Sequence, residues 1–247
     1  MEVTTETTHT TSEIRPGTWG DLFLYIFGGF GLYVIGSILV SLPFEEIDLV
    51  VVTLGILMNV LFVGGGAYIF GVRRGKITWA SLGISPPVWK NIYFVWAFFL
   101  VIGLMPIRIF IGYIVQYLLE GGTESLQFRA DLFAVSLDTW YGFLILLVGV
   151  GVLAPISEEL YFRGLLYNWF RQRTGVGWSV ALSSLLFGMA HFDSSGMAAS
   201  AFVMGVVIAL VYERTKSLWM AIAMHVITNS ISVALIFIVD LMEKYIS

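Results

Sequence analysis

Two adjacent carboxylates, Glu158 and Glu159, stand inside an apolar stretch in the second half of the sequence, and Arg163 follows them. Ionisable residues in such stretches are costly and are therefore candidates for function. Glu159 and Arg163 are four positions apart with the acid first, which is the favoured order for an ion pair along one helix face. We expect these two residues to form a structural pair. Glu158 lies about 100° further round the same helix, so it remains the carboxylate available for chemistry.

Two histidines and an amide supply further polar groups. His191 ends the run that begins at Phe187, while His225 and Asn229 are four positions apart and share one helix face. Taken alone, His191 is equally explained as a core residue whose hydrogen bonds are satisfied. His225 and Asn229, taken alone, are equally explained as a hydrogen-bonded clasp between two membrane helices.

Helix arithmetic predicts that these groups lie at similar depths in a bundle. If the chain turns at residues 174–177, a rise of ~1.5 Å per residue places Glu158 and His191 roughly 26 and 23 Å from that turn. A second turn at residues 215–216 places the other imidazole and the amide roughly 14 and 20 Å from it. We therefore expect three helices to bring a carboxylate, two imidazoles and an amide together.

Such a cluster could hydrolyse a peptide bond with an activated water. A carboxylate beside an imidazole can hold a water molecule and remove its proton. His225 and the Asn229 amide could donate hydrogen bonds to the oxyanion that develops on the attacked carbonyl. A covalent mechanism is less natural, because no Ser or Thr is tied to the cluster by a motif.

The elements that must position this cluster are membrane helices. Hydrophobic residues make up 58% of the 247-residue chain and charged residues 12%, whereas a soluble domain is roughly one quarter charged. Lipid offers no partner for an open backbone, so we expect an all-α polytopic membrane protein, a bundle of about seven or eight transmembrane helices. The predicted spans are 19–42, 47–70, 91–119, one that begins at 139, 176–192, 197–212, and 218–241 as one helix or two.

A single membrane domain is expected over residues 19–247, with the catalytic core at about 140–235. Residues 1–18 are rich in Thr and Glu and predict a disordered polar tail. The chain has no Cys, which excludes disulfides, thiolate nucleophiles and Cys-based zinc sites. No basic tract is present, so nucleic acid is not an expected partner.

The distribution of Lys and Arg predicts the orientation in the membrane. Most of the 13 basic residues fall in loops on one side of an alternating topology, whereas the opposite loops are acidic, with Arg129 as the main exception. By the positive-inside rule, the N-terminus and the basic loops are expected to be cytoplasmic. The basic loop residues include Arg73, Arg74, Lys76, Arg171, Arg173, Arg214 and Lys216.

Three of these patterns together resemble a known family. The segment EELYFRG at 158–164 resembles the EExxxR motif of the CPBP (Abi, or CAAX prenyl protease type 2) intramembrane glutamate proteases. FGMAH at 187–191 is similar to that family's FxxxH motif, and HVITN at 225–229 to its HxxxN/D motif. The resemblance covers roughly residues 140–235, with the motifs in the family's order.

The resemblance implies a role for each matched residue. Glu158 and His191 would activate water, and His225 and Asn229 would form the oxyanion site. The supporting positions would be Glu159, Arg163 and Phe187. The implied partners are the lipid bilayer and a membrane-associated protein or peptide substrate, with or without a lipid modification. The oligomeric state is left open.

A zinc site is the alternative to a metal-free one. Glu158, His191 and His225 are the alternative zinc ligands, and the family is often described as metalloproteases. The HExxH motif is absent, as are Cys ligands. A metal-free site without any cofactor is therefore favoured.

Two other classes of function compete with a protease. A proton-coupled transporter would also place Glu, His and Arg within the membrane, but no inverted halves with matched broken helices are visible. A self-immunity scaffold would keep the fold without the chemistry, yet every position of the three motifs is filled. Arg108, inside the third span, is expected to snorkel or to pair with an acid on another helix, and Gly64-Gly65-Gly66 to allow close helix packing or a kink.

Overall fold

The computed structural model describes residues 16–84, 91–125, 133–191 and 193–246. These residues form helices and turns, with no strand among them. Six of their helices are long and apolar enough to cross a membrane, and Val176–Met189 is a shorter apolar helix. The chain is therefore an all-α, multi-pass membrane protein, as predicted. Residues 1–15 of the predicted tail and Arg129 lie outside the described residues.

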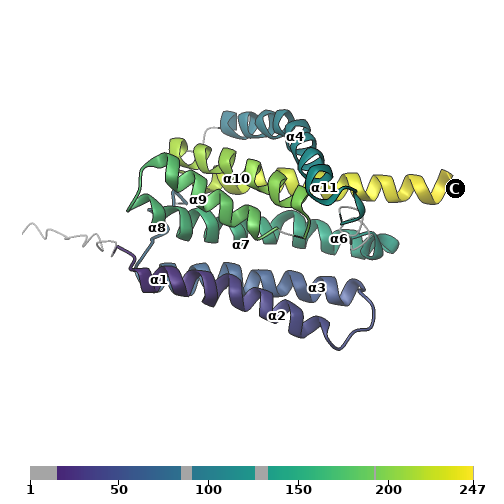
Figure 1. Cartoon of the computed structure of the whole chain (residues 1–247), viewed down its shortest axis with the longest axis horizontal. Helices are drawn as coiled ribbons and strands as arrows, with labels where there is room; N and C mark the ends of the chain where they lie inside the picture. The colour runs from purple at the N-terminus through teal and green to yellow at the C-terminus, as the bar shows by residue number, and fades with distance from the viewer. Residues whose placement is uncertain (1–15, 85–90, 126–132, 192, 247) are drawn as a thin grey trace, which may run out of the picture.

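The first two spans form an antiparallel hairpin, which is the lower layer in Figure 1. The first begins where the Thr18 hydroxyl accepts a hydrogen bond from the Asp21 amide, and the second where the Asp48 carboxylate caps the first turn. The elements of the first are α1 (Trp19–Phe23), the π-helical η1 (Leu24–Gly31) and α2 (Leu32–Ser41). Those of the second are α3 (Leu49–Met58) and the π-helical η2 (Asn59–Gly64) and η3 (Ala67–Val72).

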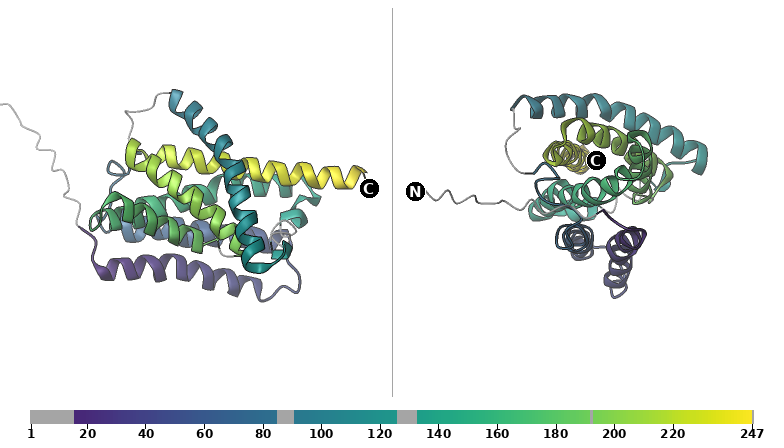
Figure 2. Two further views of the ribbon diagram at one scale, coloured as in Figure 1. Left: turned by 45° about the horizontal axis from the view of Figure 1, so that its top comes forward. Right: turned by 90° about the vertical axis from the view of Figure 1, so that its left-hand side faces the viewer.

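The third span, α4 (Asn91–Glu120), is a single helix that contains Pro106. It runs obliquely over the rest of the bundle (Figure 2). A short 3-10 turn, η4 (Val135–Asp138), precedes the fourth span.

The fourth span is one long helix built of α-helical and π-helical parts. Its elements are α6 (Trp140–Val148), η5 (Gly149–Leu153), α7 (Ala154–Glu159), η6 (Leu160–Tyr167) and α8 (Asn168–Arg171), of which η5 and η6 are π-helical. Glu158 and Glu159 therefore end a short α-helical stretch between two wider turns. Such π-helical turns are often found at functional sites.

Three helices complete the bundle: α9 (Val176–Met189), α10 (Ser195–Thr215) and α11 (Leu218–Ile246). Since α11 is continuous, the described residues contain seven apolar helices, the lower of the two predicted numbers. The turns predicted at 174–177 and 215–216 overlap the junctions between α8 and α9 and between α10 and α11, and each includes one or two residues of a helix end.

Glycines allow close approach at two helix crossings. A Cβ on Gly196 of α10 would lie 2.6 Å from the carbonyl oxygen of Gly112 in α4. A Cβ on Gly64 of η2 would lie 2.7 Å from Ser157 Oγ in α7, next to Glu158. The prediction that the glycine run at 64–66 serves helix packing is confirmed.

The basic loops gather at one end of the bundle, on the left in Figure 1. Asp21 forms ion pairs there with Arg74 at 3.1 Å and Lys76 at 2.9 Å. Arg171 and Glu213 form another, at 3.3 Å. This clustering agrees with the alternating topology, while the side of the membrane on which this end lies stays a prediction.

The absence of cysteine from the chain allows a direct test of orientation. We expect a cysteine placed at the exposed Ala80, in the first basic loop, to react with a membrane-impermeant maleimide only after the membrane is permeabilised. A cysteine in place of the exposed Glu46, in the opposite loop, should react in intact cells or spheroplasts. The reverse labelling pattern would overturn the predicted orientation, and the cysteine-free chain supplies the background.

Candidate active site

Glu159 stands at the centre of a buried polar network. Its Oε1 accepts hydrogen bonds from Arg163 Nη1 at 2.9 Å and from His225 Nδ1 at 2.7 Å. Arg163 also donates from Nη2 to the carbonyl oxygen of Gly205 at 3.1 Å. Glu159 is 0% exposed, and Arg163 and His225 are each 1% exposed. The ion pair predicted from the spacing of Glu159 and Arg163 is confirmed, and it also fixes the His225 ring.

Phe187 packs against the same network from α9. The Arg163 guanidinium carbon lies 4.6 Å from the centre of the Phe187 ring, within the range of a cation–π contact. The Phe187 ring centre lies 4.6 Å from that of His191 and 5.5 Å from that of His225. The Phe187 ring therefore packs against the arginine and both imidazoles and limits how each can turn.

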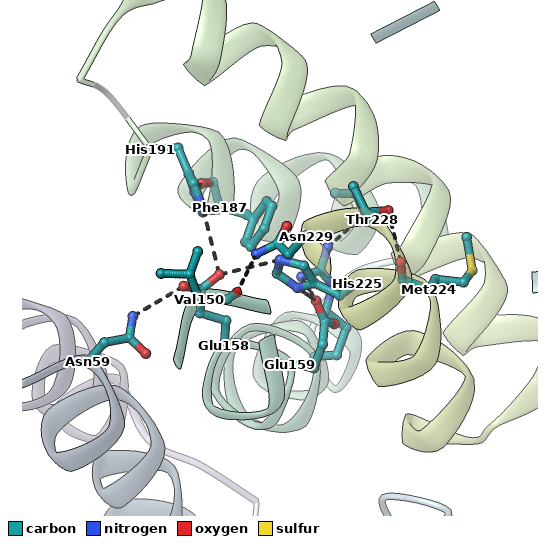
Figure 3. Close-up of polar contacts among 12 residues, drawn as sticks. Asn59, Val150, Glu158, Glu159, Phe187, His191, Met224, His225, Thr228 and Asn229 are labelled. Atoms are coloured by element: carbon teal, nitrogen blue, oxygen red, sulfur yellow. Dashed lines mark hydrogen bonds and ion pairs between the residues drawn. The ribbon is translucent and has the colours of Figure 1, made fainter. Parts of the chain in front are cut away.

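Glu158 points the other way, toward the first hairpin and both histidines (Figure 3). Its Oε1 accepts a hydrogen bond from Asn59 Nδ2 at 3.2 Å. Its Oε2 lies 3.7 Å from His191 Nε2 and 3.7 Å from His225 Nε2. The two adjacent acids thus have separate partners, as their angular separation on the helix predicts, and His225 lies between them.

The hydrogen bonds of the imidazoles indicate which nitrogens face Glu158. His191 Nδ1 lies 2.8 Å from the carbonyl oxygen of Phe187. Since a carbonyl can only accept, Nδ1 carries the proton, and the neutral ring presents the Nε2 lone pair to Glu158. In the same way, the Nδ1 of His225 donates to Glu159 and leaves Nε2 directed at Glu158.

Two cavities meet at this cluster. The first, of about 450 Å³, is lined by Asn59, Glu158, His191 and Asp193, together with mainly apolar and aromatic side chains of the first hairpin, η6 and the end of α9. The second, of about 250 Å³, is lined by His191, His225 and Asn229. His191 therefore borders both cavities, whereas Glu158 borders the first.

Asn229 does not contact Glu158. Its Nδ2 donates to the carbonyl oxygen of Val150 in η5 at 3.1 Å, which fixes the amide plane and leaves the second Nδ2 hydrogen available. Asn229 and His225 line the same cavity, so their predicted common face is present. Their roles at an oxyanion stay predictions.

Asn59 was not predicted as a site residue. It is 8% exposed, and the sequence shows it only as a single amide in an apolar span. Asn59 Oδ1 and Glu158 Oε2 are buried oxygens without a hydrogen-bond partner among the described residues. Because buried polar atoms are generally hydrogen-bonded, these two mark a place where a polar ligand is expected.

The cluster has the groups needed for acid–base chemistry. It combines two carboxylates with one guanidinium and two imidazoles, so a proton on either imidazole would bring its formal charge to zero. No group of three or more His, Cys, Asp or Glu side chains within the described part of the chain has an arrangement that could hold a metal ion. The choice between a metal-free and a zinc site stays a prediction.

Comparisons with known proteins agree with the three motifs. Residues 140–231 match the family model described as Type II CAAX prenyl endopeptidase Rce1-like. Over 119 residues the chain is 28% identical to a Bacillus subtilis (strain 168) protein named "Putative membrane peptidase YdiL", with 48% of this chain and 46% of the relative covered. The chain thus spans about half the length of that curated relative. No solved structure matches the chain significantly. The match over residues 140–231 contains every predicted site residue, and it confirms the resemblance of this segment to the type II CAAX prenyl endopeptidase family.

Proposed function

We propose that the chain is an intramembrane endopeptidase that hydrolyses a peptide bond of a membrane-associated protein or peptide with a water activated by Glu158 and His191. The observation that carries the proposal is the convergence of two imidazole nitrogens on one Glu158 oxygen, each at 3.7 Å, beside a cavity of about 450 Å³. The family match supports peptidase activity.

In the proposed mechanism, a water in the first cavity bonds to Glu158 Oε2 and His191 Nε2. Glu158 takes its proton, and the water oxygen forms a bond to the carbonyl carbon while the carbonyl π electrons move to oxygen. Collapse of this intermediate breaks the carbon–nitrogen bond, and Glu158 returns the proton to the leaving amine. His191 accepts a hydrogen bond from the water throughout and holds it in line with the carbonyl.

The second cavity receives the oxyanion in this scheme. The free Nδ2 hydrogen of Asn229 is one donor. His225 donates through Nε2 only as the doubly protonated ring, because its Nδ1 already bonds to Glu159. Glu159 lies where its charge offsets that of the ring, as the buried acid does in a Ser-His-Asp triad.

Asn59 acts as a positioning residue for Glu158. Its Nδ2 hydrogen bond fixes Oε1, so that Oε2 faces the histidines. Hydrogen bonds to charged groups contribute about 1.5–3 kcal/mol, enough to select one rotamer of a carboxylate.

Replacement of the water-activating pair provides the first test. We expect Glu158→Gln to lower kcat by about 10²–10⁴-fold, the usual contribution of a general base, and His191→Ala to lower it to a similar extent. The measurement is cleavage of membrane-tethered peptides by purified protein in lipid. Ser81→Ala, in the first basic loop, is the control for effects of substitution and purification that are unrelated to the site. Cleavage that survives both changes unaltered would show the mechanism to be wrong.

Chelation separates the metal-free mechanism from the zinc alternative. We expect cleavage to persist in EDTA and in 1,10-phenanthroline, with no stoichiometric metal found by elemental analysis. Loss of cleavage that added zinc restores would instead assign Glu158, His191 and His225 as ligands. A chelator-sensitive zinc peptidase, assayed in the same lipid, shows that the chelators reach the site.

Removal of the Asn59 amide tests its positioning role. We expect Asn59→Ala to lower kcat about 10–100-fold with KM little changed, because the lost hydrogen bond acts on the geometry of Glu158 rather than on substrate binding. Asn59→Gln should recover part of the activity. Asn168→Ala removes a half-buried amide that bonds to the backbone carbonyls of Arg163 and Gly164 and lines neither cavity, and it is the matched control. A change in KM alone would contradict the role.

A further inference from the structure

Arg108 is a cation inside the third membrane span that the proposed mechanism leaves unused. It lies near the middle of α4, two residues after Pro106, in a part of the chain outside the 140–231 family match. Its side chain is half-buried. A charge at such a depth is costly and marks a functional position by default.

Close packing of α4 on α10 fixes the place of Arg108. Gly112 and Gly196 meet where the two helices cross. One turn away on each helix, Arg108 Nε donates to the carbonyl oxygen of Ser200 at 3.2 Å. This antiparallel register places the guanidinium against α10.

The predicted acidic partner of Arg108 is not found among the described residues. Its hydrogen bond to the Ser200 carbonyl is the single polar contact that it makes with them, through Nε. The two Nη groups, which form the fork that suits a planar anion, are therefore available. A guanidinium within a membrane span that lacks an anionic partner is costly.

The second cavity places this guanidinium beside the candidate active site. Arg108 lines the cavity of about 250 Å³ that is also lined by His191, His225 and Asn229. The other described residues of the lining are apolar, except for Ser232, and no acid is among these described residues. An anion in this cavity would thus meet the Arg108 guanidinium in mainly apolar surroundings, in the same cavity as the proposed oxyanion donors.

We propose that Arg108 is the anion-binding residue of the second cavity and takes a carboxylate of the substrate, close to the bond that is cleaved. A guanidinium binds a carboxylate with two parallel hydrogen bonds. Arg108 is the one guanidinium or ammonium among the described lining residues, and the charge of a protonated His225 is already offset by Glu159. The site therefore matches the single negative charge of a carboxylate rather than a phosphate dianion. The carboxylate is either the C-terminus of the substrate or an Asp or Glu side chain. That the bound carboxylate belongs to a substrate rests on the proposed function. That Arg108 binds a carboxylate does not.

The test compares matched fluorescent peptides on protein in lipid nanodiscs. Short apolar peptides are prepared with a free C-terminal carboxylate, with a C-terminal amide, and with a C-terminal amide plus one internal Glu. Binding is measured by fluorescence anisotropy in the Glu158→Gln background, which prevents turnover, and cleavage is measured with Glu158 intact. Each protein is compared with its Arg108→Gln and Arg108→Lys variants. Arg171→Gln, which removes a guanidinium at the basic end of the bundle, is the matched control.

We expect at least one carboxylate-bearing peptide to bind about 10–100-fold more tightly than the neutral amide, as a charge-assisted bidentate pair predicts. Arg108→Gln should abolish this ratio without weakening the neutral peptide, and Arg108→Lys should keep part of it. Which peptide shows the preference distinguishes a C-terminal from a side-chain carboxylate. Arg171→Gln should leave the ratio unchanged.

Equal affinity for charged and neutral peptides with Arg108 present, a preference that survives Arg108→Gln, or no binding of any peptide would overturn the inference. If the Arg108-dependent preference is present but nothing is cleaved, the anion site stands and the proposed peptidase fails. If peptides are cleaved without such a preference, the peptidase stands and the anion site fails. Thermal unfolding of each variant in the same nanodiscs separates loss of folding from loss of binding.

Discussion

The buried carboxylate of Glu159 is the constraint on which the architecture of the site depends. Inside a membrane bundle, a charge without a partner costs several kcal/mol, and removal of one member of a buried pair costs about 3–5 kcal/mol. Glu159 meets this cost with two donors, Arg163 and His225. Since Arg163 also bonds to the backbone of α10 and lies over Phe187 of α9, one carboxylate ties together four helices of the bundle. These contacts link η6, α9, α10 and α11 around the site.

This arrangement divides structural and chemical work between neighbouring acids. Glu159 has no exposed surface, whereas Glu158 borders a cavity. His225 bonds to Glu159 and faces Glu158. The buried Glu159–Arg163 pair therefore determines how the His225 ring is oriented toward Glu158. The proposed water site lies in the first cavity and the proposed oxyanion site in the second, and His191 borders both. Arg108 adds a cation to the second cavity.

The sequence predicted the helices almost completely and the polar cluster only in part. Span limits agree with the structure within a few residues, since lipid forces every backbone group into a helix and the apolar runs are unambiguous. Helix spacing was sufficient to predict the Glu159–Arg163 pair and the convergence of Glu158 with both histidines. It was not sufficient for Asn59, whose contact with Glu158 joins residues 99 positions apart, or for the bond of Arg108 to a backbone carbonyl, because neither leaves a periodic signal. The attachment of His225 to Glu159 also depends on the rotation of α11, which spacing along one helix does not define.

The close approach of Gly64 to Ser157 bears on which part of the chain is autonomous. It clamps the backbone beside Glu158 to the second span, and the same span supplies the amide that holds the Glu158 carboxylate. The region that carries all three motifs is therefore not a self-sufficient module. A chain reduced to residues 140–231 would keep all three sequence motifs. It would lose the second span, which orients the Glu158 carboxylate. Because Asn59 and Gly64 lie in the second span and outside the three motifs, the motifs alone do not determine how the Glu158 carboxylate is oriented.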